Sequence, residues 1–432
     1  QSLSSSNPLV LVDGLERDMS LVSPEEVESV SILKDAAAVA LYGYKGINGA
    51  ILITTKRGNY NTKEVKFTYD HVMNREIRRP EFANAVTYAN AMNEAYANDG
   101  LGTRYNDWEL DAFRTGKHIN LYPAGDINAY ADVNWLDETF RDQGVSNKYS
   151  IQFMGGGSKF RYYTMVNLLT DKGFIKNPNE NEGYSTQNKY SRANLRTNLD
   201  VDLTSTTKLK LNILGTLSEL STPGNSANLW NMIYTLPSAA FPIRQSDGEW
   251  SGGGTWDGTM NPVAQAQGAA YSKGHSRSLF TDLTLSQNLS SFLPGLGANL
   301  RLAYDNYSSL WENHSKGYTY KSYSITGWEF GEPATYHQYS GGADAGMSTD
   351  ADVKAWTRQF NFAGSIDYER SFGMHDIYSQ LKWDYEYRDA TGVNTTIYRQ
   401  NVSWFTHYGF NKRYYADLAL VGSASNLLAP GH

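Results

Sequence analysis

The sequence predicts a membrane β-barrel preceded by a small α/β unit, and three observations support this prediction. Residues 26–58 combine a strand, a short helix, a glycine-rich turn and a second strand in one compact stretch. From residue 63 on, segments that alternate apolar and polar residues recur along the chain. Several of these segments exceed the roughly 5–6 residues of an ordinary globular strand and reach the about 9–11 residues that cross a bilayer.

Composition and charge argue against several classes of function. The net charge is -7, so no basic surplus exists to neutralise the phosphates of a nucleic acid. The chain contains no cysteine, which excludes disulfides, thiolate metal sites and a cysteine nucleophile. No apolar run of about 18 residues occurs, so no transmembrane helix is expected. Aromatic residues make up 13% of the chain, and this surplus suits the aromatic girdles of outer-membrane barrels.

The N-terminal unit begins with a strand at residues 8–12, an apolar run that ends in a turn at 13–14. Ser23 and Glu26 then have the spacing of a capping box, which marks the start of a helix. This helix is expected to be short, because residues 27–32 soon take on the β-branched character of a strand.

A second short helix is predicted over residues 36–42, with Asp35 as its N-cap and Gly43 at its end. Gly49 belongs to a tight turn that follows. The turn leads into residues 50–55, a β-rich run that we expect to form a strand.

Eleven alternating segments follow, and each has one apolar and one polar face. In residues 208–217, for example, Leu211 and Ile213 lie opposite Lys210 and Asn212. We expect the apolar faces to meet lipid and the polar faces to meet a wet lumen. The segments are approximately 64–74, 145–154, 158–170, 188–203, 206–219, 275–290, 296–312, 354–370, 374–390, 400–410 and 412–423.

The connections between these segments alternate between short and long. Outer-membrane barrels show the same asymmetry, with short periplasmic turns and long extracellular loops. A soluble β-sandwich also alternates apolar and polar residues, but it does not sort its loops in this way. The long connections are 75–144, 171–187, 220–274, 313–353 and 391–399.

Three phrases in the N-terminal unit are specific enough to indicate a family. They are VSILKDA at residues 30–36, LYG at 41–43 and GINGAILITTK at 46–56. Together they resemble the plug of SusC/RagA-type TonB-dependent outer-membrane transporters. The Lys-Asp-Ala form at 34–36, in place of Arg-Gly-Pro, is closer to this subfamily than to siderophore receptors.

The resemblance implies two domains. Residues 1–58 would be the C-terminal part of a plug, and residues 63–432 would be the N-terminal half of a transmembrane barrel with long extracellular loops. Barrels of this plugged kind have about 22 antiparallel strands. Eleven strands do not close, and an open sheet edge in lipid leaves backbone groups unpaired. The chain is therefore expected to be a fragment of a longer protein.

The resemblance also implies a function and a set of partners. The expected activity is TonB-dependent import of a large nutrient, an oligosaccharide or an oligopeptide, across the bacterial outer membrane. A SusD-like surface lipoprotein would cover the barrel, and TonB would act through a segment that this chain lacks. The alternatives are a soluble carbohydrate-active β protein and a siderophore- or vitamin-type TonB-dependent receptor.

No motif points to catalysis, so we expect neither an enzyme nor a cofactor. The eight histidines include no H-x-x-x-H or H-E-x-x-H pair, and no G-x-S-x-G occurs. The glycines around Lys45 lack the spacing of a phosphate-binding loop. Acidic pairs such as Asp367 and Glu369 resemble the carboxylates of a glycosidase, but lining a wet pore explains them equally well.

The long loops are rich in aromatic and amide side chains, which suit both sugar faces and peptide backbones. The same rings could instead pack the loops together or meet a partner protein, because aromatics are enriched at protein interfaces. An amphipathic helix capable of docking is predicted at residues 82–98. The candidate ligand or partner contacts are Trp250, Trp256, Tyr318, Tyr320, Trp328 and Tyr336.

Overall fold

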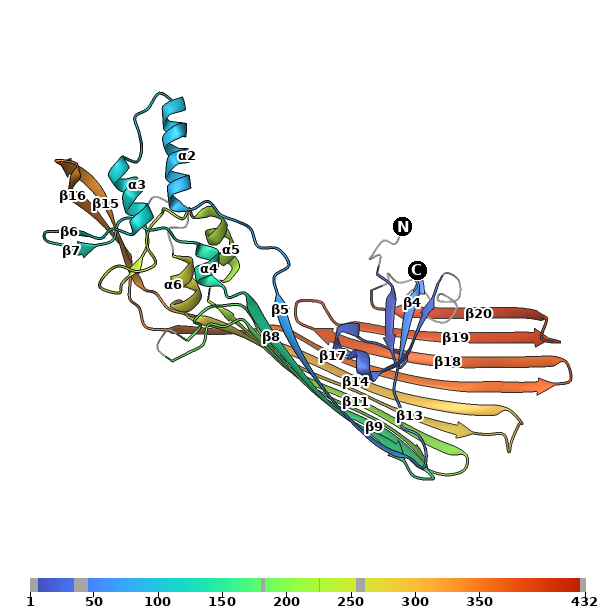
Figure 1. Cartoon of the computed structure of the whole chain (residues 1–432). Coiled ribbons are helices and arrows are strands. Elements are labelled where there is room, and N and C mark those ends of the chain that lie inside the picture. The colour runs from blue at the N-terminus through green and yellow to red at the C-terminus, as the bar shows by residue number, and fades with distance from the viewer. Residues whose placement is uncertain (1–6, 35–45, 180–182, 225, 254–260, 428–432) are drawn as a thin grey trace.

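The computed structural model describes residues 7–34, 46–179, 183–224, 226–253 and 261–427 (Figure 1). The expected helix at 36–42 and the candidate Trp256 lie outside these residues. The described chain consists of a small sheet, a large curved sheet, and a group of helices and hairpins at one end (Figure 1). Within the described ranges, no helix is both long and apolar enough to cross a membrane.

The small sheet has four strands, and we refer to it with its connections as the plug. Its strands are β1 (Leu9–Val12), β2 (Leu15–Glu16), β3 (Val27–Leu33) and β4 (Ala50–Thr55), in the order β2-β1-β4-β3. Strand β1 runs parallel to β4, and the other pairs are antiparallel. The strands expected at residues 8–12, 27–32 and 50–55 are therefore present.

Two short 3-10 turns connect β2 to β3, at Met19–Leu21 and Pro24–Glu26. The second is the expected short helix, and the Glu26 carboxylate accepts the Ser23 backbone N–H at 3.2 Å. The turn after β1 uses left-handed backbone at Asp13 (φ 51°) and Gly14 (φ 82°). Gly58 follows the last strand of the plug, at a position where any side chain would collide with the Tyr162 carbonyl oxygen.

The large sheet contains eleven antiparallel strands, and all eleven expected segments form them. Neighbouring strands in the sheet follow one another along the chain, except where strands of smaller sheets lie in the connections, and β5 and β20 are the two edges. The strands are β5 (Lys63–Arg75), β8 (Gln143–Gly156), β9 (Phe160–Lys172), β10 (Lys189–Asp202), β11 (Thr207–Pro223), β13 (Tyr271–Asn288), β14 (Leu296–Ser315), β17 (Ser348–Phe372), β18 (His375–Ala390), β19 (Ile397–Phe410) and β20 (Tyr414–Ser425).

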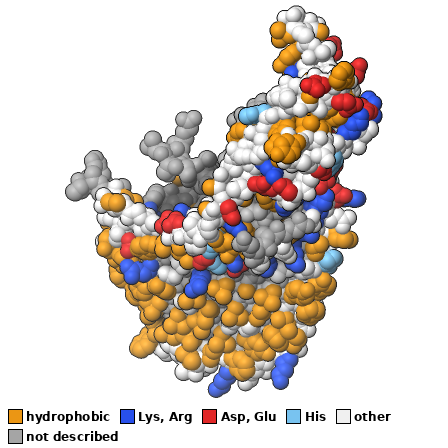
Figure 2. All heavy atoms as spheres, turned by 90° about the vertical axis from the view of Figure 1, so that its left-hand side faces the viewer, with side chains coloured by type: hydrophobic (Ala, Val, Ile, Leu, Met, Phe, Trp, Pro, Cys, Tyr) orange, Lys and Arg blue, Asp and Glu red, His pale blue; other side chains and the backbone are white. Residues whose placement is uncertain are grey.

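The register of the sheet gathers the apolar faces on its outer surface. Leu211 pairs with Leu283, Leu283 with Leu302, and Leu302 with Phe362, so one lateral row is apolar across four strands. Figure 2 shows the band that such rows form around the sheet. Members that are more than a third exposed include Phe153, Phe160, Leu168, Leu195, Leu217, Leu279, Leu300, Phe360, Ile366, Leu381, Trp383, Val402, Trp404 and Leu420. The predicted position of the apolar faces on the outer surface is confirmed.

The strands are longer than a membrane requires. Strand β17 has 25 residues, which corresponds to about 80 Å at roughly 3.3 Å per residue. The apolar band of an outer-membrane barrel is only about 25 Å tall. The long strands therefore continue past the band toward the end that carries the long connections (Figure 1).

The long connections are folded, and we call the structure that they build the cap. Most of the long connection 313–353 is a β-hairpin or an extension of β14 and β17. The helix predicted at 82–98 is present and begins at Ala85. The cap elements are α2 (Ala85–Asn98), α3 (Asp107–Thr115), β6 (Ile119–Leu121), β7 (Gly125–Ile127), α4 (Trp135–Thr139), α5 (Ser226–Thr235), β12 (Trp250–Ser251), α6 (Pro262–Gln267), β15 (Thr319–Glu329) and β16 (Glu332–Gly342).

Two hydrophobic clusters hold the cap together. One joins the first and third long connections, and its Trp135 and Phe241 rings meet with centroids 5.4 Å apart. The other surrounds Phe113 and Tyr130, with Tyr336 of the hairpin packed against it. Because both clusters join different connections, the cap is a packed unit.

Candidate functional site

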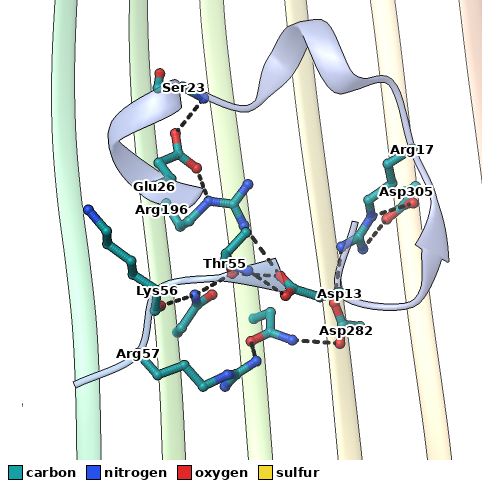
Figure 3. A network of polar contacts seen from close by, with 12 residues as sticks. Asp13, Arg17, Ser23, Glu26, Thr55, Lys56, Arg57, Arg196, Asp282 and Asp305 are labelled. Carbon is teal, nitrogen blue, oxygen red and sulfur yellow. Dashed lines mark hydrogen bonds and ion pairs between the residues drawn. The ribbon is translucent and has the colours of Figure 1, made fainter. Parts of the chain in front are cut away.

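A buried ion pair joins the plug to the wall of the large sheet (Figure 3). Arg196 on β10 donates from Nε to the Glu26 carboxylate, and the two residues are 1% and 0% exposed. Glu26 is oriented by the 3-10 turn, since its second oxygen accepts the Ser23 N–H. A charge in such a place needs its partner, because an unpaired buried charge is costly.

The ends of β1 and β4 meet the wall at the same level (Figure 3). Asp13 accepts two hydrogen bonds from Thr55, at 3.0 Å from the backbone N–H and 2.7 Å from the hydroxyl. Asn198 on β10 donates at 2.8 Å both to the Thr55 hydroxyl and to the Lys56 carbonyl. These bonds tie the last residues of the plug to the wall.

A second arginine of the plug contacts two neighbouring strands of the wall (Figure 3). Arg17 donates to both oxygens of Asp305, at 3.0 and 2.7 Å, and to Asp282 at 3.1 Å. Asp282 also accepts from Asn212 at 2.8 Å and from Arg301 at 3.2 Å. The bidentate fork of an arginine suits this arrangement, since it fixes direction as well as charge.

Three of the wall residues in this contact network, Asn198, Asn212 and Asp282, lie in one lateral row. The register pairs Asn198 with Asn212 and Asn212 with Asp282. Arg57 donates to Asn212 at 2.8 Å and also pairs with Asp200. The expectation of a wet lumen is therefore wrong at Asn212, which is buried because the plug lies on it.

Two cavities lie between the plug and the wall. One, of about 160 Å³, separates Leu9 and Leu11 of the plug from the strands β17 to β20. The other, of about 450 Å³, lies beside Arg17 and has a polar wall. Its lining from the large sheet includes Thr216, Ser218, Ser276, Arg277, Ser278, Asn306, Tyr307 and Arg388. Hydroxyl, amide and guanidinium groups of this kind suit a hydrated polar ligand.

Three of the six candidate aromatics come together in the cap. Trp250 and Tyr318 line a cavity of about 320 Å³. Their ring centroids are 6.4 Å apart, and Tyr320 lies 6.1 Å from Tyr318. The Arg244 guanidinium stacks 3.4 Å from the Trp250 centroid, which is a cation–π contact. Burial raises the pKa of the Tyr318 hydroxyl, so this group stays a neutral donor.

Two other candidates lie elsewhere in the cap. The Trp328 ring meets Trp108 with centroids 5.5 Å apart, and Tyr336 meets Tyr323 at 5.7 Å. The first contact joins the hairpin to α3, and the second lies within the hairpin, whose Tyr323 and Tyr336 pack against the cluster around Phe113. The candidate aromatics therefore do not form one site, and packing accounts for the positions of Trp328 and Tyr336.

Lys321 joins the hairpin to the third long connection. Its ammonium pairs with Asp247 and, at 3.1 Å, with Glu249. The hydrogen bond from Lys321 holds the pKa of Asp247 below its ordinary value of 3.8. A group with a lowered pKa stabilises the fold fully above its ordinary value, and this contribution is lost as the pH falls through the lowered value.

We expect Lys321→Met to speed hydrogen exchange in residues 247–252 at neutral pH. The wild type should keep its slow exchange from pH 7 down to about pH 4 and lose it below that, and the variant should lack this acid step. Exchange in the strands of the wall serves as the internal control. An acid step of equal size in the variant would contradict the assignment.

The sequence did not single out the plug–wall residues. The alternation of apolar and polar residues places Arg301 and Asp305 on the polar face of their strand. It does not show which polar residues contact the plug. Arg17 and Glu26 stand in no motif beyond the capping box. In the described residues, no group of three or more side chains is placed to hold a metal ion.

Comparisons with known proteins agree with this geometry. Residues 2–50 match the TonB-dependent receptor plug domain family. The chain is 30% identical over 190 residues to the TonB-dependent receptor SusC of Bacteroides thetaiotaomicron, covering 41% of this chain and 16% of that protein. It is 26% identical over 212 residues to the TonB-dependent receptor P3 of Formosa agariphila, covering 49% of this chain and 17% of that protein.

Solved structures share the fold. The structure of the RagAB peptide transporter matches 98% of this chain and 49% of that chain, with a TM-score of 0.68 and 15% identity. The "open-open" state of the RagAB peptide importer matches with a TM-score of 0.69. The chain thus spans about half the length of these structures and less than a quarter of the curated relatives.

The chain combines a plug on the inner face of an antiparallel sheet with long connections gathered at one end, and it is similar to TonB-dependent receptors in its plug domain and over part of its length. SusC is one of these relatives, and the fold of the described residues is that of the RagAB peptide transporter.

Proposed function

We propose that the protein imports a large nutrient, an oligosaccharide or an oligopeptide, across the outer membrane in a TonB-dependent manner. One observation carries the proposal: the plug is fixed to the inner wall by buried ion pairs beneath a folded cap. A passage closed in this way needs an energy source to open it. The polar cavity beside Arg17 also suits the passage of a hydrated ligand.

The proposal assigns a place to each part. Residues 1–58 act as the C-terminal part of the plug, and residues 63–432 as the N-terminal half of the barrel with its long loops outside the cell. A SusD-like lipoprotein covers the cap, and TonB supplies the energy for import. The name of the RagAB peptide importer supports an oligopeptide as the imported ligand. The likeness to SusC supports a SusD-like lipoprotein as the partner.

Trp250 and Tyr318 are the favoured ligand contacts within the cap. Both line the same cavity, together with charged groups such as Asp344 and Glu249. A flat ring beside polar groups is a suitable surface for a sugar face or a peptide backbone. Tyr320 adjoins them and would extend the same surface.

The exposed apolar band argues against a soluble carbohydrate-active protein. Soluble monomers rarely expose an apolar patch larger than a few hundred Å², whereas the band crosses all the strands from β8 to β20. A siderophore- or vitamin-type receptor remains the alternative within the class, and uptake of that ligand alone would favour it.

A disulfide between plug and wall tests the proposal. This chain has no cysteine, and the Thr55 and Asn198 side chains are in hydrogen-bond contact at 2.8 Å. We expect Thr55→Cys with Asn198→Cys in the full-length protein to stop uptake under oxidising conditions and to restore it after reduction. Uptake is measured in the native bacterium with fluorescent oligosaccharides and oligopeptides, each with and without collapse of the proton gradient.

A matched pair within the wall controls for oxidation itself. Ser379 and Thr406 face each other across β18 and β19, with their hydroxyl oxygens 2.9 Å apart. Ser379→Cys with Thr406→Cys should leave uptake unchanged. Import that persists with the plug locked would overturn the proposal, as would the absence of uptake of either ligand class by the wild type.

A further inference from the structure

A fully exposed phenylalanine stands at the tip of the β15–β16 hairpin. Phe330 and Gly331 form the two-residue turn between the paired Glu329 and Glu332. Phe330 is 105% exposed, so its own chain buries none of the ring. Both turn residues have positive φ, 52° and 83°, which is the pattern of a type I′ hairpin turn.

Phenylalanine is an unfavourable choice at this position. Type I′ turns favour Asn, Asp and Gly, because short side chains tolerate left-handed backbone and bulky ones are strained there. Phe330 therefore combines backbone strain with an exposed ring, and strain of this kind clusters at functional sites. The other non-glycine residues with positive φ in the described ranges are Asp13, Asn61, Asn177, Asn394, Asn411 and Lys412.

The hairpin that presents the ring is firmly held. The Trp108 ring meets Trp328 edge to face, and its indole N–H donates to Glu332 at 2.8 Å. Tyr323 and Tyr336 pack against the cluster around Phe113. A ring on a rigid mount loses little conformational entropy when it binds, so its position suits recognition.

We propose that Phe330 is an anchor that inserts into an apolar pocket of a partner protein at the cell surface, and that lysine or arginine side chains rim that pocket. Glu329 and Glu332 flank the ring, and complementary charge at the edge of a contact favours a basic rim. A buried aromatic surrounded by polar contacts is the usual form of an interface hot spot.

Other occupants fit the tip less well. A small ligand needs a concave site, and the tip of a turn is convex. A membrane is disfavoured because the hairpin lies at the far end of the cap from the large sheet (Figure 1), and because its two carboxylates repel anionic lipid. The inference rests on the proposed placement of the cap outside the cell, and it does not depend on which ligand is imported.

Photocrosslinking in the native outer membrane tests the anchor. The photoreactive analogue benzoylphenylalanine replaces Phe330 in the full-length protein. A control carries it at Val393, which is 88% exposed in the connection between β18 and β19. We expect residue 330 to crosslink to one protein, in a peptide that lines an apolar pocket with basic residues at its rim. Crosslinks only to lipopolysaccharide, only to this chain, or none would overturn the inference.

A substitution distinguishes the contribution of the Phe330 ring from that of the hairpin that presents it. Phe330→Asn removes the ring and supplies a residue that the turn favours. Its affinity for the crosslinked partner should fall about thirtyfold, as for a hot spot. Hydrogen exchange in residues 319–342 should slow about fivefold, because the strain is relieved. Unchanged affinity, or faster exchange in the hairpin, would overturn the inference.

The outcomes for anchor and importer are distinguishable. If residue 330 crosslinks as expected but the wild type takes up neither ligand class, the import proposal fails and the anchor stands. If the disulfide-locked plug stops uptake but residue 330 forms no crosslink to another protein, the anchor fails alone.

Discussion

Replacing Arg196 with methionine is expected to release the plug from the wall. The substitution leaves the Glu26 carboxylate buried without its partner, which costs about 3–5 kcal/mol in comparable ion pairs. Hydrogen exchange in β3 and β4 of the full-length protein should therefore speed up at least a hundredfold, while the strands of the large sheet keep their protection. The measurement is hydrogen exchange followed by mass spectrometry in detergent.

Two further variants show whether the effect comes from the buried charge. Arg196→Met combined with Glu26→Gln should recover a large part of the loss, because the Glu26 charge is removed and the Asp13 carboxylate, 3.9 Å from Arg196, keeps its two hydrogen bonds from Thr55. The neighbouring pair of Glu25 and Lys148 joins the same turn to the wall but is partly exposed. Lys148→Met should cost less than about 1 kcal/mol. Equal losses for Lys148→Met and Arg196→Met would contradict the assignment.

The second large effect is expected on the outer face of the sheet. Val402 lies within the apolar band and is 52% exposed, and its neighbour Ser403 lines the inner cavity beside the plug. Val402→Arg should cost about 2–4 kcal/mol in a bilayer, as for cations near the midplane of other barrels. Ser403→Arg should cost much less. The free energies come from equilibrium unfolding of the full-length protein in lipid vesicles.

Ser403 is a better inner-face position for this test than Asn212. Asn212 lies on the polar face beside the lipid-facing Leu211, but it binds Arg57 and Asp282 and is buried by the plug. An arginine there would disrupt the plug contacts in addition to changing the polarity. Equal costs for Val402→Arg and Ser403→Arg would show that the two faces are not distinguished by lipid and water.

Most of the fold could be predicted from the alternation of apolar and polar residues along the strands. Leu211 and Asn212 appear on opposite faces because side chains in a strand alternate, and the structure places them so. The plug strands followed from short apolar runs between turn residues. The β15–β16 hairpin was missed because its turn is Phe-Gly, and the usual hairpin signal is Asn-Gly.

The candidate site was harder to predict for a physical reason. The Arg17–Asp305 contact joins residues 288 positions apart, and the Arg196–Glu26 contact joins residues 170 apart. Such partners depend on how the plug seats against the register of the wall, which no local pattern encodes. Trp250 and Tyr318 line one cavity, whereas Trp328 and Tyr336 pack within the cap, and composition alone could not separate these two roles.

The order of strands in the plug sets the route by which a pull on the chain would reach the wall. Strand β4 lies between β1 and β3 and continues through residues 56–62 directly into β5. Tension applied at the start of β1 is first borne by its four residue pairs with β4. It next reaches the Asp13–Thr55 link, and only after that the turn that holds Glu26. The four-pair β1–β4 ladder, which is shorter than the six-pair β3–β4 ladder, thus stands nearest the source of force, and the buried charges stand last.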